Sequence, residues 1–220
     1  MKVYFDKAFT KIAVLGSGTM GGQIAAHFAN LGFDTLMFDT SEEALSKSLA
    51  MMKKLKPTPF ASPSVSASIK TATYDNLDAL SSCDFIIESI VENLDIKKQL
   101  FKKISPHVND NAVLVTNTSG LSIQQIAETS PESLRSRIFG VHFFNPPRYL
   151  RLFEVIPHTE TDPSLTSFLM EFGDLVLGKQ TVLCKDTPGF IGNRIGVMSG
   201  IKVLQLTEKY NFTIEEVDLL

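Results

Sequence analysis

The sequence of 220 residues contains no tryptophan, only two cysteines and no excess of basic residues. Cys83 and Cys184 are too few for a disulfide framework or a four-cysteine zinc site, so we expect neither disulfides nor a metal centre. The 24 acidic residues outnumber the 21 basic ones, which argues against nucleic acid as the main partner. No apolar run approaches the roughly 20 residues of a membrane span, and residues 1–10 do not resemble a secretory signal. These absences indicate a reducing, cytoplasmic setting.

The remaining composition is ordinary for a globular chain, with 44% hydrophobic and 20% charged residues. The length fits one large domain, or one domain and the start of a second. Apolar, β-rich segments alternate with segments of helical spacing. The predicted strands cover residues 11–15, 35–38, 85–87, 112–116, 138–144, 152–156 and 181–184. The predicted helices cover residues 20–31, about 40–55, 94–104, a short stretch after 122, 162–177 and about 189–210.

This alternation predicts an α/β fold of the Rossmann type, with a doubly wound, mainly parallel sheet. Thr40 and Glu43 have the spacing of a capping box and predict the start of the second helix there. Residues 57–68 contain three prolines and four serines, and we expect them to form a surface connection rather than a helix.

The C-terminal end begins another helix. Thr213 and Glu216 form a capping-box pattern, and the chain stops four residues later. We therefore expect one domain over residues 1–187 and the truncated beginning of a C-terminal helical domain over residues 188–220. The alternative is a terminal helical stub.

Residues 16–21 read Gly-Ser-Gly-Thr-Met-Gly, directly after a predicted strand and at the start of a predicted helix. This context identifies a dinucleotide-binding turn. Gly16 permits the tight turn, Gly18 lets the backbone approach a pyrophosphate, and Gly21 lets the helix pack close to the strand. The free N–H groups of the helix N-terminus attract the phosphates.

Asp39 ends the second strand about 20 residues after this turn, where a carboxylate takes the ribose hydroxyls of a dinucleotide. A carboxylate repels a 2′-phosphate, and residues 40–43 contain no arginine or lysine. The sequence therefore favours NAD over NADP. A turn or helix-capping role for Asp39 is the alternative.

Histidine is the commonest proton acceptor near neutral pH. Of the four histidines, His27, His107 and His158 have structural or solvated surroundings in the sequence. His142 lies where an apolar strand runs into two prolines, and Glu154 lies in the next strand. If the two strands form a hairpin centred on residue 148, the two residues pair directly across it. Such a pair is either a general base with its orienting acid or a structural pair that closes a hairpin.

Six ordered motifs resemble the NAD-binding part of the L-3-hydroxyacyl-CoA dehydrogenase family of fatty-acid β-oxidation. They cover nearly the whole chain, from about residue 11 to the end. The motifs are Gly16-x-Gly-x-Met-Gly21, Val91-Glu-Asn-Leu94 with Lys97, Asn117-Thr-Ser119, His142-Phe-Phe-Asn-Pro146, Glu154-Val-Ile156 and Lys185-Asp-Thr-Pro-Gly-Phe-Ile-Gly-Asn-Arg194.

The resemblance implies oxidation of L-3-hydroxyacyl-CoA to 3-ketoacyl-CoA. It implies that His142 takes the C3 hydroxyl proton, that Glu154 holds His142, and that Ser119 and Asn193 contact the reacting oxygen or the thioester region. The implied cofactor is NAD. The implied cofactor-binding residues are Gly16, Gly18, Thr19, Met20, Gly21, Asp39, Glu92, Lys97, Asn117, Ser119 and Asn145.

Two departures from the family pattern bear on the partners. A long helical hairpin that follows the second strand in many members is shortened here to one helix and residues 57–68, as in members fused to an enoyl-CoA hydratase-like region. Lys53, Lys54 and Lys56 either meet CoA phosphates or form a solvated helix face. The C-terminal helical domain, which covers the acyl site and forms homodimers in the family, is almost wholly missing.

Other readings stay open at this point. Dehydrogenases of 3-hydroxyisobutyrate and 6-phosphogluconate share the glycine motif but act through a lysine in a downstream glycine-rich motif, which we do not find. Nucleotide-sugar dehydrogenases use a cysteine, and Cys184 lacks an activating glycine-rich loop. The remaining alternatives are a dehydrogenase of a different short β-hydroxy acid and an NAD-binding module without turnover.

Overall fold

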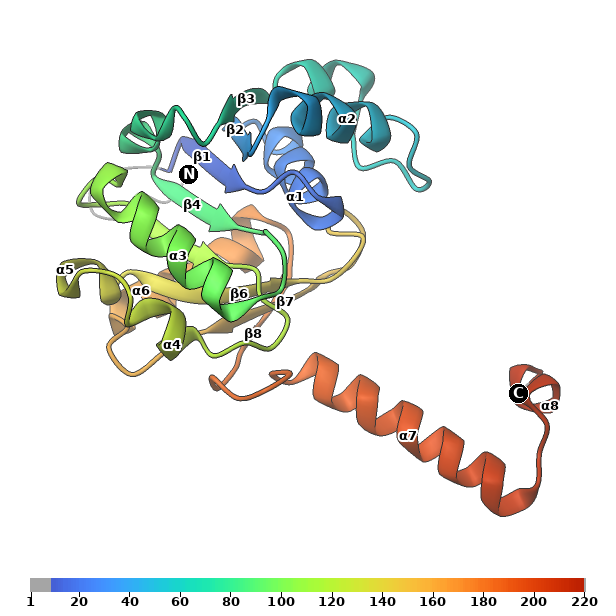
Figure 1. Cartoon of the computed structure of the whole chain (residues 1–220). Coiled ribbons are helices and arrows are strands. Elements are labelled where there is room, and N and C mark those ends of the chain that lie inside the picture. The colour runs from blue at the N-terminus through green and yellow to red at the C-terminus, as the bar shows by residue number, and fades with distance from the viewer. Residues whose placement is uncertain (1–8, 220) are drawn as a thin grey trace.

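The computed structural model describes residues 9–219, so most of the N-terminal stretch in which we expect no secretory signal lies outside the described residues. Within this range, eight strands form one sheet in the order β3-β2-β1-β4-β5-β6-β7-β8 (Figure 1). The strands are β1 (Lys11–Leu15), β2 (Asp34–Asp39), β3 (Lys70–Thr73), β4 (Phe85–Glu88), β5 (Val113–Thr116), β6 (Ile138–Phe143), β7 (Leu152–Ile156) and β8 (Gln180–Leu183).

The first six strands are parallel, and the strand order reverses between β1 and β4. In open sheets of this kind, ligands bind beyond the carboxyl ends of the strands at such a reversal. β7 runs antiparallel to β6, and β8 runs parallel to β7. The predicted Rossmann-type, mainly parallel sheet is confirmed.

Helices cover both faces of the sheet because its central strands are apolar on both sides. Residues of α1, α2 and α6 share one buried cluster with Ile12 and Val14, and residues of α3 and α4 share a second cluster with Ala13 and Leu15. The helices are α1 (Thr19–Asn30), α2 (Glu42–Met52), α3 (Leu94–Ile104), α4 (Ile123–Ala127), α5 (Glu132–Arg135), α6 (Pro163–Glu171), α7 (Gly192–Tyr210) and α8 (Ile214–Asp218).

Several boundaries differ from the prediction. The edge strand β3 is missed, because only Ala72 of its four residues is buried and the segment shows no apolar run. The capping box at Thr40 is wrong: Ser41 is the N-cap of α2 and accepts from the Ala44 amide, while Thr40 donates to Asp39. The predicted capping box at the start of α8 is present.

The β6–β7 hairpin has the predicted register, with His142 opposite Glu154. Its tip is fixed on both sides. The buried Lys179 ammonium donates to the carbonyls of Pro147 and Leu150. Arg148 donates to the carbonyls of Thr58 and Phe60, which binds the tip to the proline- and serine-rich connection. That connection contains a 3-10 turn but no α-helix, as predicted.

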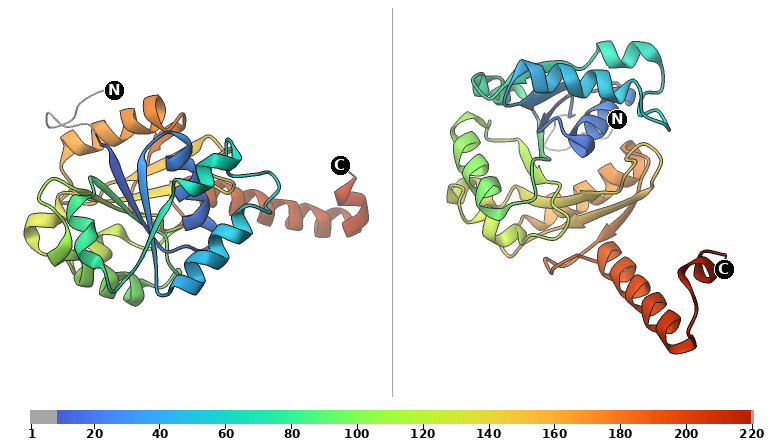
Figure 2. Two further views of the ribbon diagram at one scale, coloured as in Figure 1. Left: turned by 90° about the horizontal axis from the view of Figure 1, so that it is seen from above. Right: turned by 45° about the vertical axis from the view of Figure 1, so that its right-hand side comes forward.

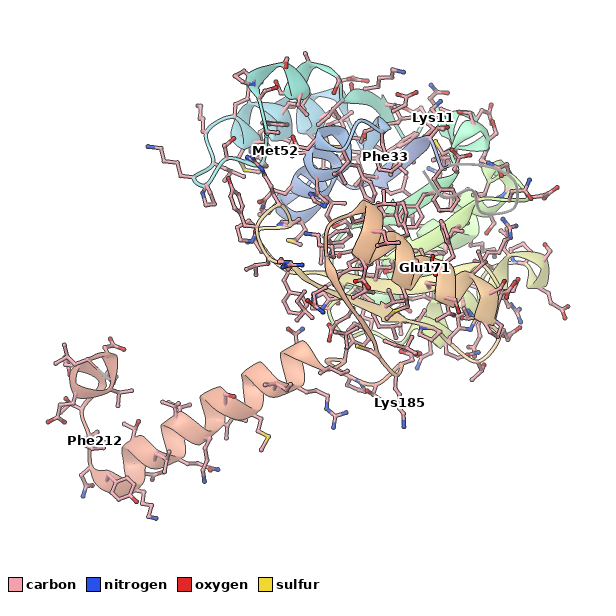
Figure 3. The ribbon with its side chains drawn as sticks, turned by 180° about the vertical axis from the view of Figure 1, so that it is seen from behind. Lys11, Phe33, Met52, Glu171, Lys185 and Phe212 are labelled. Carbon is pink, nitrogen blue, oxygen red and sulfur yellow. The ribbon has the colours of Figure 1, made fainter. Side chains whose placement is uncertain are left out.

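α7 projects away from the sheet, with α8 at its far end (Figure 2). None of its 19 residues is buried, although apolar side chains such as Ile195, Met198 and Leu204 lie along it. In Figure 3, Lys185 marks the place where the chain leaves the sheet and Phe212 marks the far end of the helix. Across residues 9–219, the helices all fall short of the length and apolarity needed to cross a membrane.

His27 is a buried histidine on α1, 7% exposed, and its Nε2 lies 3.1 Å from the Leu177 carbonyl oxygen. Burial and the nearby charge of Lys179 lower the pKa of His27 to about 4 from its ordinary 6.5. The unfolded chain therefore binds a proton between these two values while the folded chain does not. Above pH 6.5, His27 is neutral in both states and its full contribution to the free energy of unfolding is present. As the pH falls toward 4, only the unfolded state gains a proton, and this contribution is lost.

We predict that the free energy of unfolding falls by about 3 kcal/mol between pH 6.5 and pH 4 through His27 alone. In the His27→Gln variant, which keeps a donor for Leu177, this pH dependence should flatten. Urea unfolding across the pH range measures both, with His107→Gln as the control because His107 pairs with Asp78 at the surface. Parallel stability curves for wild type and His27→Gln would contradict the assignment.

Candidate functional site

The glycine turn joins β1 to α1 in a form that only small residues allow. Gly16 has φ of 102°, and a Cβ there would lie 2.5 Å from the Ser89 carbonyl oxygen. A Cβ on Gly21 would collide with the Gly16 carbonyl oxygen. Gly18 is the N-cap of α1, and a Cβ there would meet nothing within 4 Å. The backbone before α1 is therefore open to a ligand, as the pyrophosphate role requires.

Asp39 lies at the carboxyl end of β2 and faces this turn. Its Oδ2 accepts from the amide and the hydroxyl of Ser17, at 2.7 and 2.5 Å, and its Oδ1 accepts from Thr40. Burial raises the pKa of Asp39, but the hydrogen bonds from Ser17 and Thr40 outweigh burial and hold the pKa below its ordinary value. The side chain is thus a carboxylate that already shapes the turn, so the turn role left open by the sequence is present as well.

A cavity of about 850 Å³ opens beyond the carboxyl ends of β1, β2, β4 and β5. Seven of the residues predicted to bind the cofactor or the reacting groups line it: Gly18, Thr19, Met20, Asp39, Glu92, Asn117 and Ser119. Tyr74, Gln99 and Lys103 extend its wall. The cavity lies at the reversal of strand order, where the fold places nucleotides, so these residues fit a bound dinucleotide.

Lys97, also predicted to bind the cofactor, is not among the residues that line this cavity. It is 1% exposed, and its Nζ lies 2.6 Å from Glu88 Oε1 and 3.4 Å from Glu92 Oε2. Glu88 also accepts from the Thr116 hydroxyl and the Ile90 amide. Lys97 therefore neutralises Glu88 and approaches Glu92, whose Oε1 also accepts from the Thr118 hydroxyl and the Ser119 amide.

His142 and Glu154 form the second part of the site. Their side chains meet across the hairpin, with His142 Nδ1 2.7 Å from Glu154 Oε2. The two residues are 5% and 0% exposed. The His142 ring packs against Phe144, with 4.4 Å between the ring centroids, and against Phe190 at 6.0 Å.

The other oxygen of Glu154 is also engaged. Its Oε1 accepts from the amides of Ile191 and Gly192, at 3.0 and 2.8 Å, and from the Cys184 thiol at 3.5 Å. Burial raises the pKa of Glu154, but the hydrogen bonds from His142, Gly192 and Ile191 prevail and lower it below the ordinary value. A carboxylate only accepts, so Nδ1 of His142 carries the hydrogen and Nε2 of the neutral ring is the acceptor.

Hydrogen bonds connect the His142–Glu154 pair to the nucleotide cavity. Asn117, which lines the cavity, accepts from the Phe143 amide next to His142. The Asn193 side chain donates to the Ser119 carbonyl at 3.0 Å. Asn145 lies outside the cavity lining, but it accepts from Gln23, which also donates to the Thr19 carbonyl at the start of α1. The predicted residues thus form two adjoining groups on one edge of the sheet.

Three parts of this arrangement escape sequence reasoning. Glu88 is missed, although a lone acid at the end of an apolar strand is a usable signal. Cys184, interpreted as a small strand residue, follows β8 and bonds to Glu154. The backbone donors of Ile191 and Gly192 carry no side-chain signal.

Comparison with known proteins gives one consistent family. The family described as "3-hydroxyacyl-CoA dehydrogenase, NAD binding domain" matches residues 11–187. A probable 3-hydroxyacyl-CoA dehydrogenase of Bacillus subtilis is 40% identical over 96% of this chain and 30% of its own length. A second probable 3-hydroxyacyl-CoA dehydrogenase, from Deinococcus radiodurans, is 38% identical over 96% of this chain and 63% of its own length.

Among solved structures, 3-hydroxybutyryl-CoA dehydrogenase from Escherichia coli K12 superposes with a TM-score of 0.81 at 31% identity. The match covers 92% of this chain and 43% of that one. The chain thus spans less than two thirds of the length of each of these three proteins.

We predict that Lys97→Met destabilises the fold by about 3–5 kcal/mol, because it leaves the buried Glu88 carboxylate without a counter-charge. Adding Glu88→Gln should recover most of the loss. Denaturant unfolding measures the change, and Lys102→Met, on the exposed face of the same helix, is the control. A Lys97→Met variant as stable as wild type would show that Glu88 does not depend on this ammonium.

Proposed function

Because the chain belongs to the 3-hydroxyacyl-CoA dehydrogenase family, as a member of its NAD-binding domain, we propose that it supports oxidation of L-3-hydroxyacyl-CoA to 3-ketoacyl-CoA, with His142 as the general base. One observation carries this proposal: a buried imidazole, held at 2.7 Å by a carboxylate, next to a cavity that fits a dinucleotide. The proposal concerns a protein of the relatives' full length, because this chain spans 30% and 63% of the two curated relatives.

The proposed oxidation removes the proton of the C3 hydroxyl and a hydride from C3 of the substrate. It therefore needs a proton acceptor and a hydride acceptor beside C3. With Nδ1 bonded to Glu154, His142 Nε2 is the atom that takes the hydroxyl proton. Glu154 stays ionised and stabilises the imidazolium that forms. Bound NAD supplies the hydride acceptor. We propose that Ser119 and Asn193, which are joined by a hydrogen bond, contact the reacting oxygen or the thioester.

In this proposal, some of the cofactor residues contact the dinucleotide and others only position the residues that do. The backbone at Gly18, Thr19 and Met20 receives the pyrophosphate, and Asp39 receives the ribose. Glu92, Asn117 and Ser119 line the remainder of the cavity. Gly16 and Gly21 shape the turn, and Lys97 and Asn145 act from outside the cavity.

Family membership and the structure support several wider proposals. We propose a role in fatty-acid β-oxidation and a domain division at residue 187, where the family match ends. We also propose homodimer formation through a C-terminal helical domain, for which the exposed apolar side chains of α7 are support. A fused enoyl-CoA hydratase-like region fits relatives more than three times as long as this chain. Two free cysteines are consistent with a reducing, cytoplasmic compartment.

Two alternatives are separable by experiment. The resemblance to a 3-hydroxybutyryl-CoA dehydrogenase favours a short acyl chain as the second candidate. The chain alone also fits an NAD-binding module without turnover, because none of the residues of α7 is buried. Absorbance at 340 nm with NADH separates both: consumption with acetoacetyl-CoA but not with a long-chain 3-ketoacyl-CoA supports the short acyl chain, and binding of NADH without consumption of either supports the module.

We predict that His142→Gln, made in a catalytically active form of the protein, lowers kcat by at least about 10²-fold, because it removes the positioned base. NADH affinity should stay within about twofold, since His142 lies outside the residues that line the cavity. Steady-state kinetics and NADH fluorescence measure the two effects. The control is His107→Gln at the surface, and near-normal turnover of His142→Gln would remove the assignment.

We predict that the chain binds NADH more tightly than NADPH, and that Asp39→Asn weakens NADH binding by about 10-fold or more while narrowing the difference. The variant keeps the shape of the side chain but loses a charge-assisted acceptor for the ribose and the repulsion of a 2′-phosphate. Fluorescence titration gives both affinities. Asp110→Asn, exposed before β5 and outside the cavity lining, matches the charge change, and an unaltered NADH to NADPH ratio in Asp39→Asn would refute this role.

A further inference from the structure

We propose that the first turn of α7 is part of the apparatus that positions His142, with Gly192 as a positioning residue. The proposal rests on the proposed function for its catalytic meaning, but its physical content is independent of turnover. It states that the placement of α7 and the orientation of the His142 imidazole are coupled through the two oxygens of Glu154.

The coupling begins at a carboxylate shared between a ring and a helix. Glu154 Oε2 accepts a hydrogen bond from Nδ1 of His142, and Oε1 accepts from the amides of Ile191 and Gly192. These amides belong to the residues that open α7, where N–H groups have no partner within the helix. Because Glu154 is fully buried, neither oxygen has water as a replacement partner.

Gly192 is coupled to His142 by a second, steric route. A Cβ at position 192 would lie 2.6 Å from the Phe144 ring and 3.3 Å from Leu152. The same Phe144 ring packs against the His142 imidazole. A side chain at 192 therefore displaces either α7, with its bonds to Glu154, or Phe144, with its contact to His142.

The segment that leads into α7 is bonded to the sheet body on both sides of the Glu154 contact. Asp186 accepts from Ser122 and from the amides of Ile123 and Gln124 at the start of α4. Asn193 donates to the Ser119 carbonyl. The chain between β8 and α7 is thus bound to the sheet body on both sides of the Glu154 contact, and movement of α7 is transmitted to the carboxylate.

Few other ionisable groups contact the pair. The Cys184 thiol donates to Glu154 Oε1, and burial raises its pKa to about 12, so the thiol stays neutral near neutral pH. Asp186 is engaged at α4, and Arg194 of α7 reaches the Thr187 hydroxyl at 3.5 Å. A change at the α7 amides with the midpoint of His142 therefore reports the shared carboxylate.

The first test uses the unaltered chain and NMR. A pH titration follows the His142 ring together with the backbone amides along α7. We expect the Ile191 and Gly192 amide signals to shift with the same midpoint as the His142 ring, because protonation of the ring redistributes charge on Glu154. The amides of Gly196 and Gly200, further along the same helix, should not follow it. If the chemical shifts of the Ile191 and Gly192 amides do not change with the midpoint of the His142 ring, the proposal is overturned.

The second test compares two glycines of one helix. Gly192→Ala should shift or abolish the low-field Nδ1–H proton signal of His142. Gly196→Ala should leave it unchanged, since a Cβ there meets nothing within 4 Å. An unchanged signal in a folded Gly192→Ala variant would also overturn the proposal, and if that variant does not fold, the titration of the unaltered chain decides.

These outcomes are separate from the fate of the proposed function. If the α7 amides follow His142 but the whole protein does not oxidise 3-hydroxyacyl-CoA, the coupling stands and the function fails. If the protein oxidises 3-hydroxyacyl-CoA and the amide signals do not follow His142, the function stands and the coupling fails. In an active protein, we expect Gly192→Ala to lower kcat with little change in KM for NAD.

Discussion

One buried carboxylate, Glu154, organises the candidate site. It is fully buried, and in isolation a buried charge of this kind would be protonated or excluded from the fold. Four donors bond to it, one imidazole, two amides and one thiol, and the bonds from the imidazole and the amides lower its pKa. The same bonds tie together β6, β7, the residue after β8 and the start of α7. The orientation of the imidazole is therefore a consequence of how these four segments pack.

A second buried charge performs a related task at the nucleotide cavity. Glu88 ends β4 at the strand reversal, and Lys97 of α3 neutralises it. Lys97 also approaches Glu92, whose other oxygen accepts from the Thr118 hydroxyl and the Ser119 amide, so the buried pair helps to place a residue on the cavity wall. In both places a charge that the core tolerates only when fully bonded fixes a polar side chain at the edge of the sheet.

Much of this fold was predictable because its signals are local. The turn between β1 and α1 needs glycine at Gly16 and Gly21 because a Cβ there would collide with nearby backbone, and the glycine pattern that meets this need is visible in the sequence. The helix ends at Ser122 and Thr213 carry their own caps. The short strand β3 has no such signal. Ser41, and not Thr40, is the N-cap of α2, because Thr40 donates its hydrogen bonds to Asp39. Contacts such as Glu88 with Lys97, nine residues apart but brought together by burial, need the packed structure.

The pairing of His142 with Glu154 was predictable for a different reason, which also explains why the seventh strand matters. Neighbouring parallel strands are joined by long crossovers, so their register cannot be read from spacing. An antiparallel hairpin fixes its register through the turn, and opposite side chains then face each other at short range. β7 is the strand that departs from the parallel order, and it lies beside β6 at the edge of the nucleotide half. The antiparallel addition therefore gives a nucleotide-binding sheet a directly opposed imidazole and carboxylate, and the bonds of Asn117 and Asn193 connect that pair to the cavity.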